Sequence, residues 1–135
     1  MKLAVDTNVL VSATISDGPP RRLLELASEG TLELIVPDLV LTELGRVLGQ
    51  KLGLHSEVFA RLLDQLAELP AQTVATPLDA EAISGDRADD RILAAALAAG
   101  AEVLISGDRR HLLPLGAVEG MRILRPQELL AELAG

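Results

Sequence analysis

The chain has 135 residues, a net charge of −8 and no cysteine. That length suits a single domain over residues 1–135, and an apolar content of 49% favours folding over disorder. The lack of cysteine excludes disulfides, zinc–thiolate sites, iron–sulfur clusters and a cysteine nucleophile. No signal peptide is expected because Asp6 interrupts the first apolar run, and no stretch approaches the roughly 20 apolar residues of a membrane span. We therefore expect a cytoplasmic protein without membrane attachment.

The charge and the lack of aromatic residues limit how this chain could bind nucleic acid. A protein that binds nucleic acid over a broad face usually carries a basic stripe, whereas this chain has 12 basic and 20 acidic residues. Phe59 is the only aromatic residue, so bases cannot stack on aromatic platforms. Neither observation excludes a nuclease whose acids are gathered around metal ions.

The apolar pattern predicts strands that alternate with helices. Short apolar runs predict strands at residues 2–5, 32–36, 73–75, 102–106 and 121–124. Helical spacing, proline starts and glycine ends predict helices from residue 8 and at residues 19–29, 38–49, 55–69, 92–99 and 126–133. Helices between strands imply parallel crossovers. The predicted fold is α/β, a three-layer α/β/α sandwich with a central, mainly parallel sheet of about five strands.

Acidic residues follow the predicted strands, where parallel sheets bind their ligands. Asp6 directly follows the first strand and Asp108 follows the fourth, so neighbouring strands would place both carboxylates in one crevice. Glu43 lies at the margin of the apolar face of its helix, half-buried. Asp89 lies on the inward side at the first turn of helix 92–99. These four acids are the candidate site.

Each acid also has an ordinary structural explanation. Asp6 and Asp89 could cap helices, Glu43 could pair with Arg46, and Asp108 could end its strand in an Asx-turn. Converging carboxylates, however, repel one another and keep their charge when a divalent cation lies among them. Ligands that are all acidic oxygens favour Mg²⁺ or Mn²⁺ over zinc. Together the acids predict a cation site that could activate water for phosphodiester hydrolysis.

Other catalytic patterns are absent from the sequence. There is no nucleophile elbow, phosphate loop or dinucleotide-binding glycine motif. His55 and His111 are far apart in sequence, and we expect structural or surface roles for both. A receiver-like signalling domain also gathers acids at strand ends, but it is expected to have a lysine in its pocket. Neither Lys2 nor Lys51 follows a late strand.

Several stretches resemble PIN-domain nucleases, in the right order and over nearly the whole chain. They are VDTNVLVSA at 5–13, LTEL with RVL at 41–48, DRADDRILAAA at 86–96, GAE with LISGD at 100–108, and RILRP at 122–126. The branch they resemble is that of the toxin components of prokaryotic toxin–antitoxin pairs, relatives of the VapC toxins. Arg87 departs from this branch, which often has proline there.

The resemblance implies a metal-dependent ribonuclease whose products carry 5′-phosphate and 3′-hydroxyl ends. It implies that one or two Mg²⁺ or Mn²⁺ ions are held by an acidic quartet of Asp6, Glu43, Asp89 and Asp108. Asn8 would brace the turn at Asp6, Ser106 would hydrogen-bond within the pocket, and Asp86 would be a supporting group or a cap. Asp90 adjoins Asp89, and the spacing to the following Ile-Leu pair favours Asp89 as the third acid.

The partners are also matters of resemblance. An RNA substrate, an antitoxin protein and a homodimer or higher oligomer are implied, with helices between residues 38 and 69 as candidate contact elements. Candidate contacts to RNA phosphates, which solvated helix faces would explain equally well, are Arg21, Arg22, Arg87, Arg91, Arg109 and Arg110. The alternative is a PIN-fold binding protein that does not cleave and acts through a partner, and the intact quartet argues against it.

Overall fold

The computed structural model describes residues 1–51 and 56–135, and within these ranges it contains one six-stranded sheet in the order β3-β2-β1-β4-β6-β5. The strands are β1 Lys2–Val5, β2 Glu33–Pro37, β3 Ala71–Val74, β4 Val103–Ile105, β5 Ala117–Val118 and β6 Met121–Leu124. All neighbours pair in parallel except β5, which is antiparallel to β6. The predicted α/β class with a mainly parallel sheet is confirmed.

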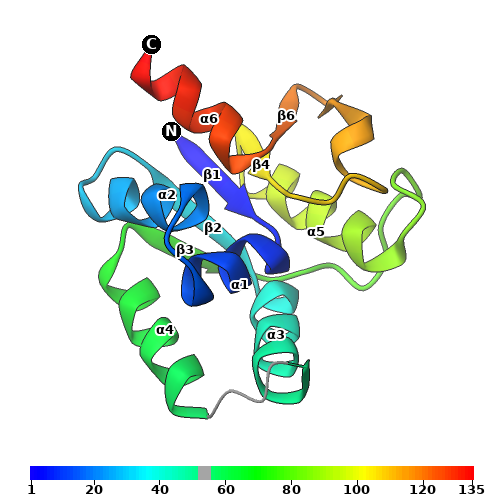
Figure 1. The fold of residues 1–135 in the computed structure, drawn as a ribbon. Coiled ribbons are helices and arrows are strands. Elements are labelled where there is room, and N and C mark those ends of the chain that lie inside the picture. Colours follow the sequence, from blue (N-terminus) through cyan, green and yellow to red (C-terminus); the bar gives the residue numbers. More distant parts are fainter. Residues whose placement is uncertain (52–55) are drawn as a thin grey trace.

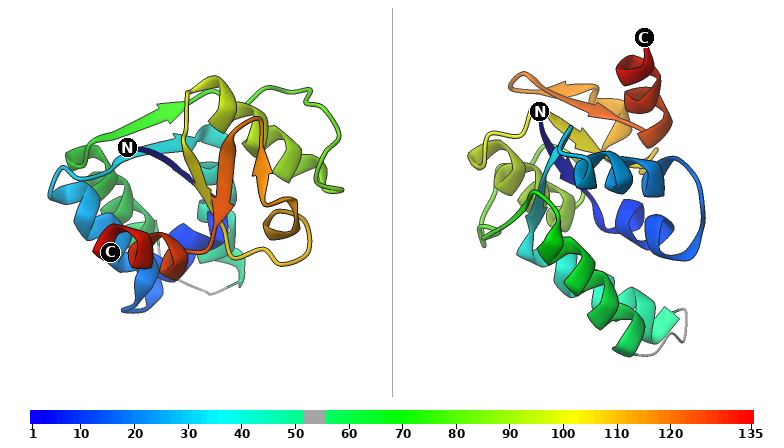
Figure 2. Two further views of the ribbon diagram at one scale, coloured as in Figure 1. Left: turned by 90° about the horizontal axis from the view of Figure 1, so that it is seen from above. Right: turned by 90° about the vertical axis from the view of Figure 1, so that its left-hand side faces the viewer.

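Helices cover both faces of this sheet. They are α1 Thr7–Ile15, α2 Pro19–Ser28, α3 Asp38–Arg46, α4 Ser56–Glu68, α5 Arg87–Ala98 and α6 Pro126–Ala134. Helix α5 packs on one face, whereas α1, α2 and α6 lie on the other (Figure 2). Helices α3 and α4 form the lower part of the molecule in Figure 1, beyond the end of β1 that leads into α1. None of the described helices is both long and apolar enough to cross a membrane.

The boundaries differ from the predicted ones where local hydrogen bonds extend or interrupt an element. Helix α5 begins at Arg87, before the apolar stretch, because the Asp86 side chain accepts a hydrogen bond from the Asp89 N–H and caps it. The helix predicted over 38–49 changes at Val47 into a π-helical turn, Val47–Lys51. The third strand lies at Ala71–Val74, two residues before the predicted start. His55, the predicted start of the next helix, lies outside the described residues.

The register of the two central strands determines where the site lies. Val5 of β1 is paired with Ile105 of β4, so the residues that follow both strands emerge at the same level. The Asp6 N–H continues this pairing by donating to the Ile105 carbonyl at 3.1 Å. The chain leaves β1 toward β2 on one side, while β4 lies on the other side of β1. This is a topological switch point, where open α/β sheets hold ligands.

Candidate active site

Asp6 is the buried centre of the site. Its side chain is 5% exposed, and Oδ1 accepts a hydrogen bond from the Val9 N–H at 3.0 Å, which caps α1. Its other oxygen, Oδ2, accepts a hydrogen bond from the Ser106 hydroxyl. Asp6 is therefore both a helix cap and a buried carboxylate at the end of β1, and the two roles do not exclude each other.

Ser106 connects Asp6 to Asp108. The Ser106 hydroxyl is fully buried and accepts a hydrogen bond from the Asp108 N–H at 3.0 Å. The Asp108 Oδ1 in turn accepts from the N–H groups of Arg110 at 2.8 Å and His111 at 3.0 Å, as in an Asx-turn. His111 takes part through its backbone, and its Nδ1 lies 3.3 Å from the Ser84 carbonyl oxygen.

Two more acids reach the same pocket from helices on different sides. Glu43 comes from α3, and its Oε1 accepts a hydrogen bond from the Thr7 hydroxyl at 3.1 Å. Asp89 comes from the first turn of α5 and is half-buried. All four predicted acids line one pocket of about 200 Å³, together with Thr7, Asn8, Arg46, Val47 and Ile92.

The two adjacent aspartates of α5 face different surroundings. Asp89 lines the pocket, whereas Asp90 does not. The Asp90 Oδ1 accepts hydrogen bonds from the N–H groups of Ile83 and Ser84 at 3.0 and 2.7 Å, and Asp90 is only 7% exposed. Asp90 therefore anchors the loop before α5, and Asp86 caps that helix. The geometry favours Asp89 as the third acid of the pocket.

Two of the pocket acids, Asp6 and Asp89, have pKa values raised toward neutral pH. Burial raises the pKa of Asp6 to about 6. The hydrogen bonds from Ser106 and Val9 lower this pKa, and the charges of Asp108 and Glu43 raise it further. Burial, the charge of Asp86 and a hydrogen bond with Asp108 raise the pKa of Asp89 to about 7. Burial alone would raise the pKa of Asp108, but hydrogen bonds from His111 and Arg110 outweigh it and lower that pKa. Of Asp89 and Asp108, Asp89 is thus the one that keeps its proton to higher pH.

The donor set suits a hard divalent cation. The carboxylates of Asp6, Glu43, Asp89 and Asp108 are ligands of the type that Mg²⁺ and Mn²⁺ prefer. In the arrangement seen here, no three acidic or histidine side chains of the described residues are placed to hold one ion. A cation bound by these acids would compete with the proton that Asp89 retains because of its raised pKa.

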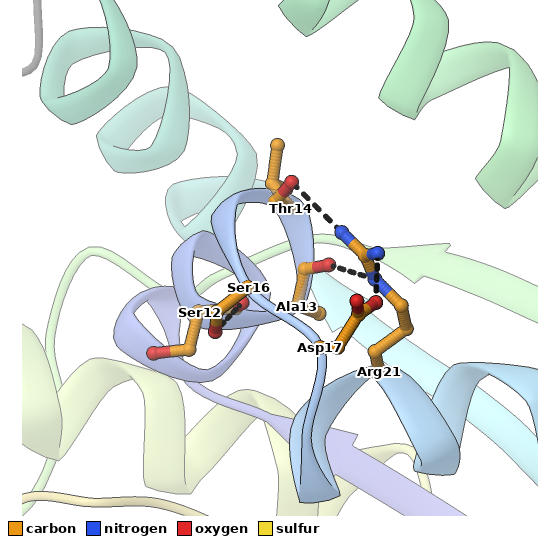
Figure 3. Close-up of polar contacts among 6 residues, drawn as sticks. All are labelled: Ser12, Ala13, Thr14, Ser16, Asp17 and Arg21. Carbon is orange, nitrogen blue, oxygen red and sulfur yellow. Dashed lines mark hydrogen bonds and ion pairs between the residues drawn. The ribbon is translucent and has the colours of Figure 1, made fainter.

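None of the six predicted RNA-contacting arginines lines the pocket, and four of them have other contacts. Arg21 binds the end of α1: its Nε donates to the Ala13 carbonyl at 3.0 Å, its Nη2 donates to the Thr14 carbonyl at 3.2 Å, and it pairs with Asp17 (Figure 3). Arg22 pairs with Glu25 and Glu29, Arg87 pairs with Asp79, and Arg91 donates to the Pro77 carbonyl. Arg109 and Arg110 are exposed.

Arg46 and Thr7 are the residues that sequence reasoning did not assign to the site. Arg46 was considered only as a partner for Glu43, but no ion pair joins them in the described residues, and Arg46 lines the pocket. Its position one helical turn after Glu43 was the available signal. The Thr7 hydroxyl donates to Glu43 and so positions that carboxylate in the pocket.

Comparison with known proteins bears on the fold and the family of this chain. A family model described as PIN domain matches residues 2–110. The chain is similar to the solved structure of VapBC2 from Rickettsia felis bound to a DNA fragment from their promoter, with 17% identity, a TM-score of 0.62, and coverage of 91% of this chain and 97% of that chain. It is similar to PAE2754 from Pyrobaculum aerophilum, with 18% identity, a TM-score of 0.64, and coverage of 99% and 90%.

A third similar structure is the PIN domain endonuclease Utp24, with 17% identity, a TM-score of 0.52, and coverage of 90% of this chain and 82% of that chain. None of the curated proteins matches the sequence. At these identities the structural likeness concerns the fold, and the family model carries the assignment. The resemblance inferred from the sequence motifs is thereby confirmed.

Proposed function

The chain belongs to the PIN domain family, and on this premise we propose that it is a metal-dependent endoribonuclease, the toxin of a toxin–antitoxin pair. The observation that carries the proposal is the pocket at the switch point. Carboxylates from the ends of β1 and β4 and from α3 and α5 line it together, around a buried and hydrogen-bonded Asp6. Such a concentration of acids has a natural role in holding cations for phosphodiester chemistry.

The residues of the pocket have different proposed roles. Asp6, Asp89, Asp108 and Glu43 would hold Mg²⁺ or Mn²⁺. A cation bound there would supply Lewis acidity, which lowers the pKa of water and offsets negative charge on the phosphoryl group. Asp6 is fixed from both sides by Val9 and Ser106, so its carboxylate is already oriented before any ligand binds. Asp89, whose pKa burial raises to about 7, would have to lose its proton to serve as a ligand.

Arg46 is the proposed phosphate contact. It lines the acidic pocket from α3, and in the described part of the chain no carboxylate pairs with its guanidinium. A guanidinium at the rim can bind a phosphate next to the one being cleaved, through charge-assisted hydrogen bonds. It would also keep the polyanionic substrate from being repelled by acids that hold no cation.

An antitoxin protein is part of the same proposal. It rests on the motifs that resemble VapC toxins and on the structural likeness to VapBC2. An arginine-bearing segment of such a partner would complement the acidic pocket and compete with the cation.

The test is cleavage of a mixed RNA pool with Mn²⁺, with Mg²⁺ and with a chelator. Wild type should cut only with a cation and leave 5′-phosphate and 3′-hydroxyl ends, and Asp6→Asn should abolish cutting because it removes a charged ligand without changing side-chain size. Asp64→Asn makes the same chemical change at an exposed position of α4 and should cut like wild type. Undiminished cutting by Asp6→Asn, or none by folded wild type with either cation, would overturn the proposal.

A further inference from the structure

A second hollow, of about 400 Å³, opens beside the acidic pocket. It lies between the first turns of α1 and the starts of α2 and α6. Val9 and Pro126 are buried at its base, while Asn8, Pro19 and Gln127 are exposed around it.

The hollow adjoins the acidic pocket. Asn8 lines both of them. Gly107, which also lines the hollow, lies in the chain between the buried Ser106 and the pocket residue Asp108. A polymer whose phosphate is held at the acids would therefore place the neighbouring group of its chain over this second hollow.

The lining differs in chemistry from the acidic pocket. Among the described residues, its lining has no charged side chain. The rings of Pro19, Pro20 and Pro126 give it apolar walls, and its polar groups are neutral amides and a hydroxyl. Such a lining does not suit a phosphate, and it does suit a flat neutral group with hydrogen-bonding edges. The volume is near the lower end of ligand pockets, which span roughly 300 to 1,000 Å³.

The polar groups of the lining are free to bind a ligand. Within residues 1–51 and 56–135, no hydrogen bond occupies the Ser12 hydroxyl or the side-chain amides of Asn8 and Gln127. Figure 3 shows the Ser12 side chain pointing away from the contacts of Arg21. An amide presents a donor and an acceptor side by side, the pattern that reads a base edge.

We propose that this hollow is a nucleobase subsite, which holds the base of a nucleotide next to the scissile phosphate. The proline rings pack against the faces of the base. In many proteins that bind single strands, aromatic residues have this role, but Phe59 is the only aromatic residue of this chain. Gln127 and Ser12 bond its edges and give the enzyme a base preference at one position. The inference rests on the proposed nuclease function for its consequence in cleavage, but not for binding of the base itself.

Binding is tested first, on metal-free protein, by NMR titration with each of the four ribonucleosides. A Cβ built at Gly107 meets no atom within 4 Å, and Gly107 is not among the glycines with positive φ, so Gly107→Val adds a side chain to the lining without backbone strain. The Gln127 side-chain amide and the Gly107 N–H should shift in wild type, and the Gln127 shift should be lost in Gly107→Val. Gln65→Ala, an exposed glutamine change on α4, should keep both shifts. Shifts that are absent or that map elsewhere would overturn the subsite.

Cleavage is tested second, by sequencing the ends cut from a randomised RNA. Gln127→Ala should weaken the base preference at one flanking position by about two- to tenfold, the effect of losing one or two neutral hydrogen bonds. On RNA that lacks a base at that position, Gln127→Ala and wild type should have the same KM. An unchanged base profile in both Gln127→Ala and Gly107→Val would overturn the inference while leaving the nuclease intact. Nucleoside binding without any cleavage by wild type would instead overturn the proposed function alone.

Discussion

Asp6 combines a stabilising hydrogen-bond role with a destabilising charge. It caps α1 through the Val9 N–H, yet its carboxylate is buried near Asp108 and Glu43. Because burial raises its pKa from 3.8 to about 6, the folded metal-free protein binds this proton more tightly than the unfolded chain does. The charged form of Asp6 therefore lowers the free energy of unfolding. The loss is complete at pH values above about 6 and absent below the unfolded pKa of 3.8.

The expected consequence is that Asp6→Asn stabilises the metal-free protein. Asparagine retains an oxygen for the Val9 N–H and carries no charge, so the free energy of unfolding should rise at pH 8 by up to about 3 kcal/mol, the value of a shift of about two pKa units. The gain should shrink as the pH falls through 6 and vanish near pH 4. Urea unfolding with chelator at these three pH values measures it, and a less stable Asp6→Asn at pH 8 would contradict it.

The proton that Asp89 holds makes cation affinity dependent on pH. With pKa values of about 6 for Asp6 and about 7 for Asp89, raised chiefly by burial, both acids must lose protons before they bind a cation. The Kd for Mn²⁺ should thus rise as the pH falls from about 8 to about 5.5, and binding at about pH 6.5 should release about one proton. Calorimetry in two buffers of different ionisation enthalpy counts that proton. Binding that releases none at pH 6.5 would contradict the assignment of Asp89.

At the scale of the element, α5 presents two neighbouring aspartates with separate tasks. Asp90 accepts from two N–H groups of residues 83 and 84, so Asp90→Ala should cost about 3 kcal/mol of unfolding free energy by leaving those donors unpaired. Asp90→Asn retains the acceptor and should cost about 1 kcal/mol. Both should keep their Mn²⁺ affinity, whereas Asp89→Asn should lose it with little loss of stability. Thermal unfolding and calorimetry on the three variants measure the two effects. Loss of Mn²⁺ affinity in the Asp90 variants with affinity retained in Asp89→Asn would mean that Asp90, and not Asp89, binds the cation.

The sequence contained enough to predict the elements that carry the acids. Asp6 and Asp108 follow strands that are apolar apart from Lys2, and the rule that ligands bind beyond parallel strand ends placed them together. The spacing to Ile92 and Leu93 favoured Asp89 over Asp90 but could not settle the choice. The deciding contacts of Asp90 come from the loop at residues 83 and 84. Strand β5, with two residues, is too short to show any alternation.

The arginines show where sequence reasoning ends. Arg21 looked like a solvated candidate for RNA, but its guanidinium is occupied by the carbonyl groups at the end of α1 (Figure 3). That contact depends on the turn between α1 and α2, and no local pattern specifies it. Arg46 lies in the pocket because α3 packs against α1 and brings its outer edge over the end of β1.

At the scale of the whole molecule, the site depends on bringing together parts of the chain that are far apart. Ser106 and Asp6 are 100 residues apart in sequence and share a hydrogen bond because β1 and β4 are neighbours in the sheet. No single helix or strand carries the pocket, so its geometry depends on the packing of the whole sheet and its helices. A stable fold is therefore a condition for any cation binding.

The charge of the whole molecule predicts a weak dependence of RNA binding on salt. The chain carries a net charge of −8, and in the described residues Arg46 is the one basic side chain that lines the acidic pocket. For single strands, log affinity falls with log salt by about 0.7 for each phosphate neutralised, so the slope should lie near −1. A broad basic face would give a much steeper one.

The measurement is the KM for a short single-stranded RNA from about 50 to about 300 mM KCl at constant free Mg²⁺. The slope is that of log(1/KM) against log salt. Arg46→Ala should raise KM and bring the slope toward zero, because it removes the one basic side chain that lines the pocket in the described part of the chain. Arg22→Ala, which changes an exposed arginine paired with Glu25 and Glu29, should leave both unchanged. A wild-type slope steeper than about −3 would mean several phosphate contacts, and Arg87, Arg109 and Arg110 would then return as candidates in place of Arg46.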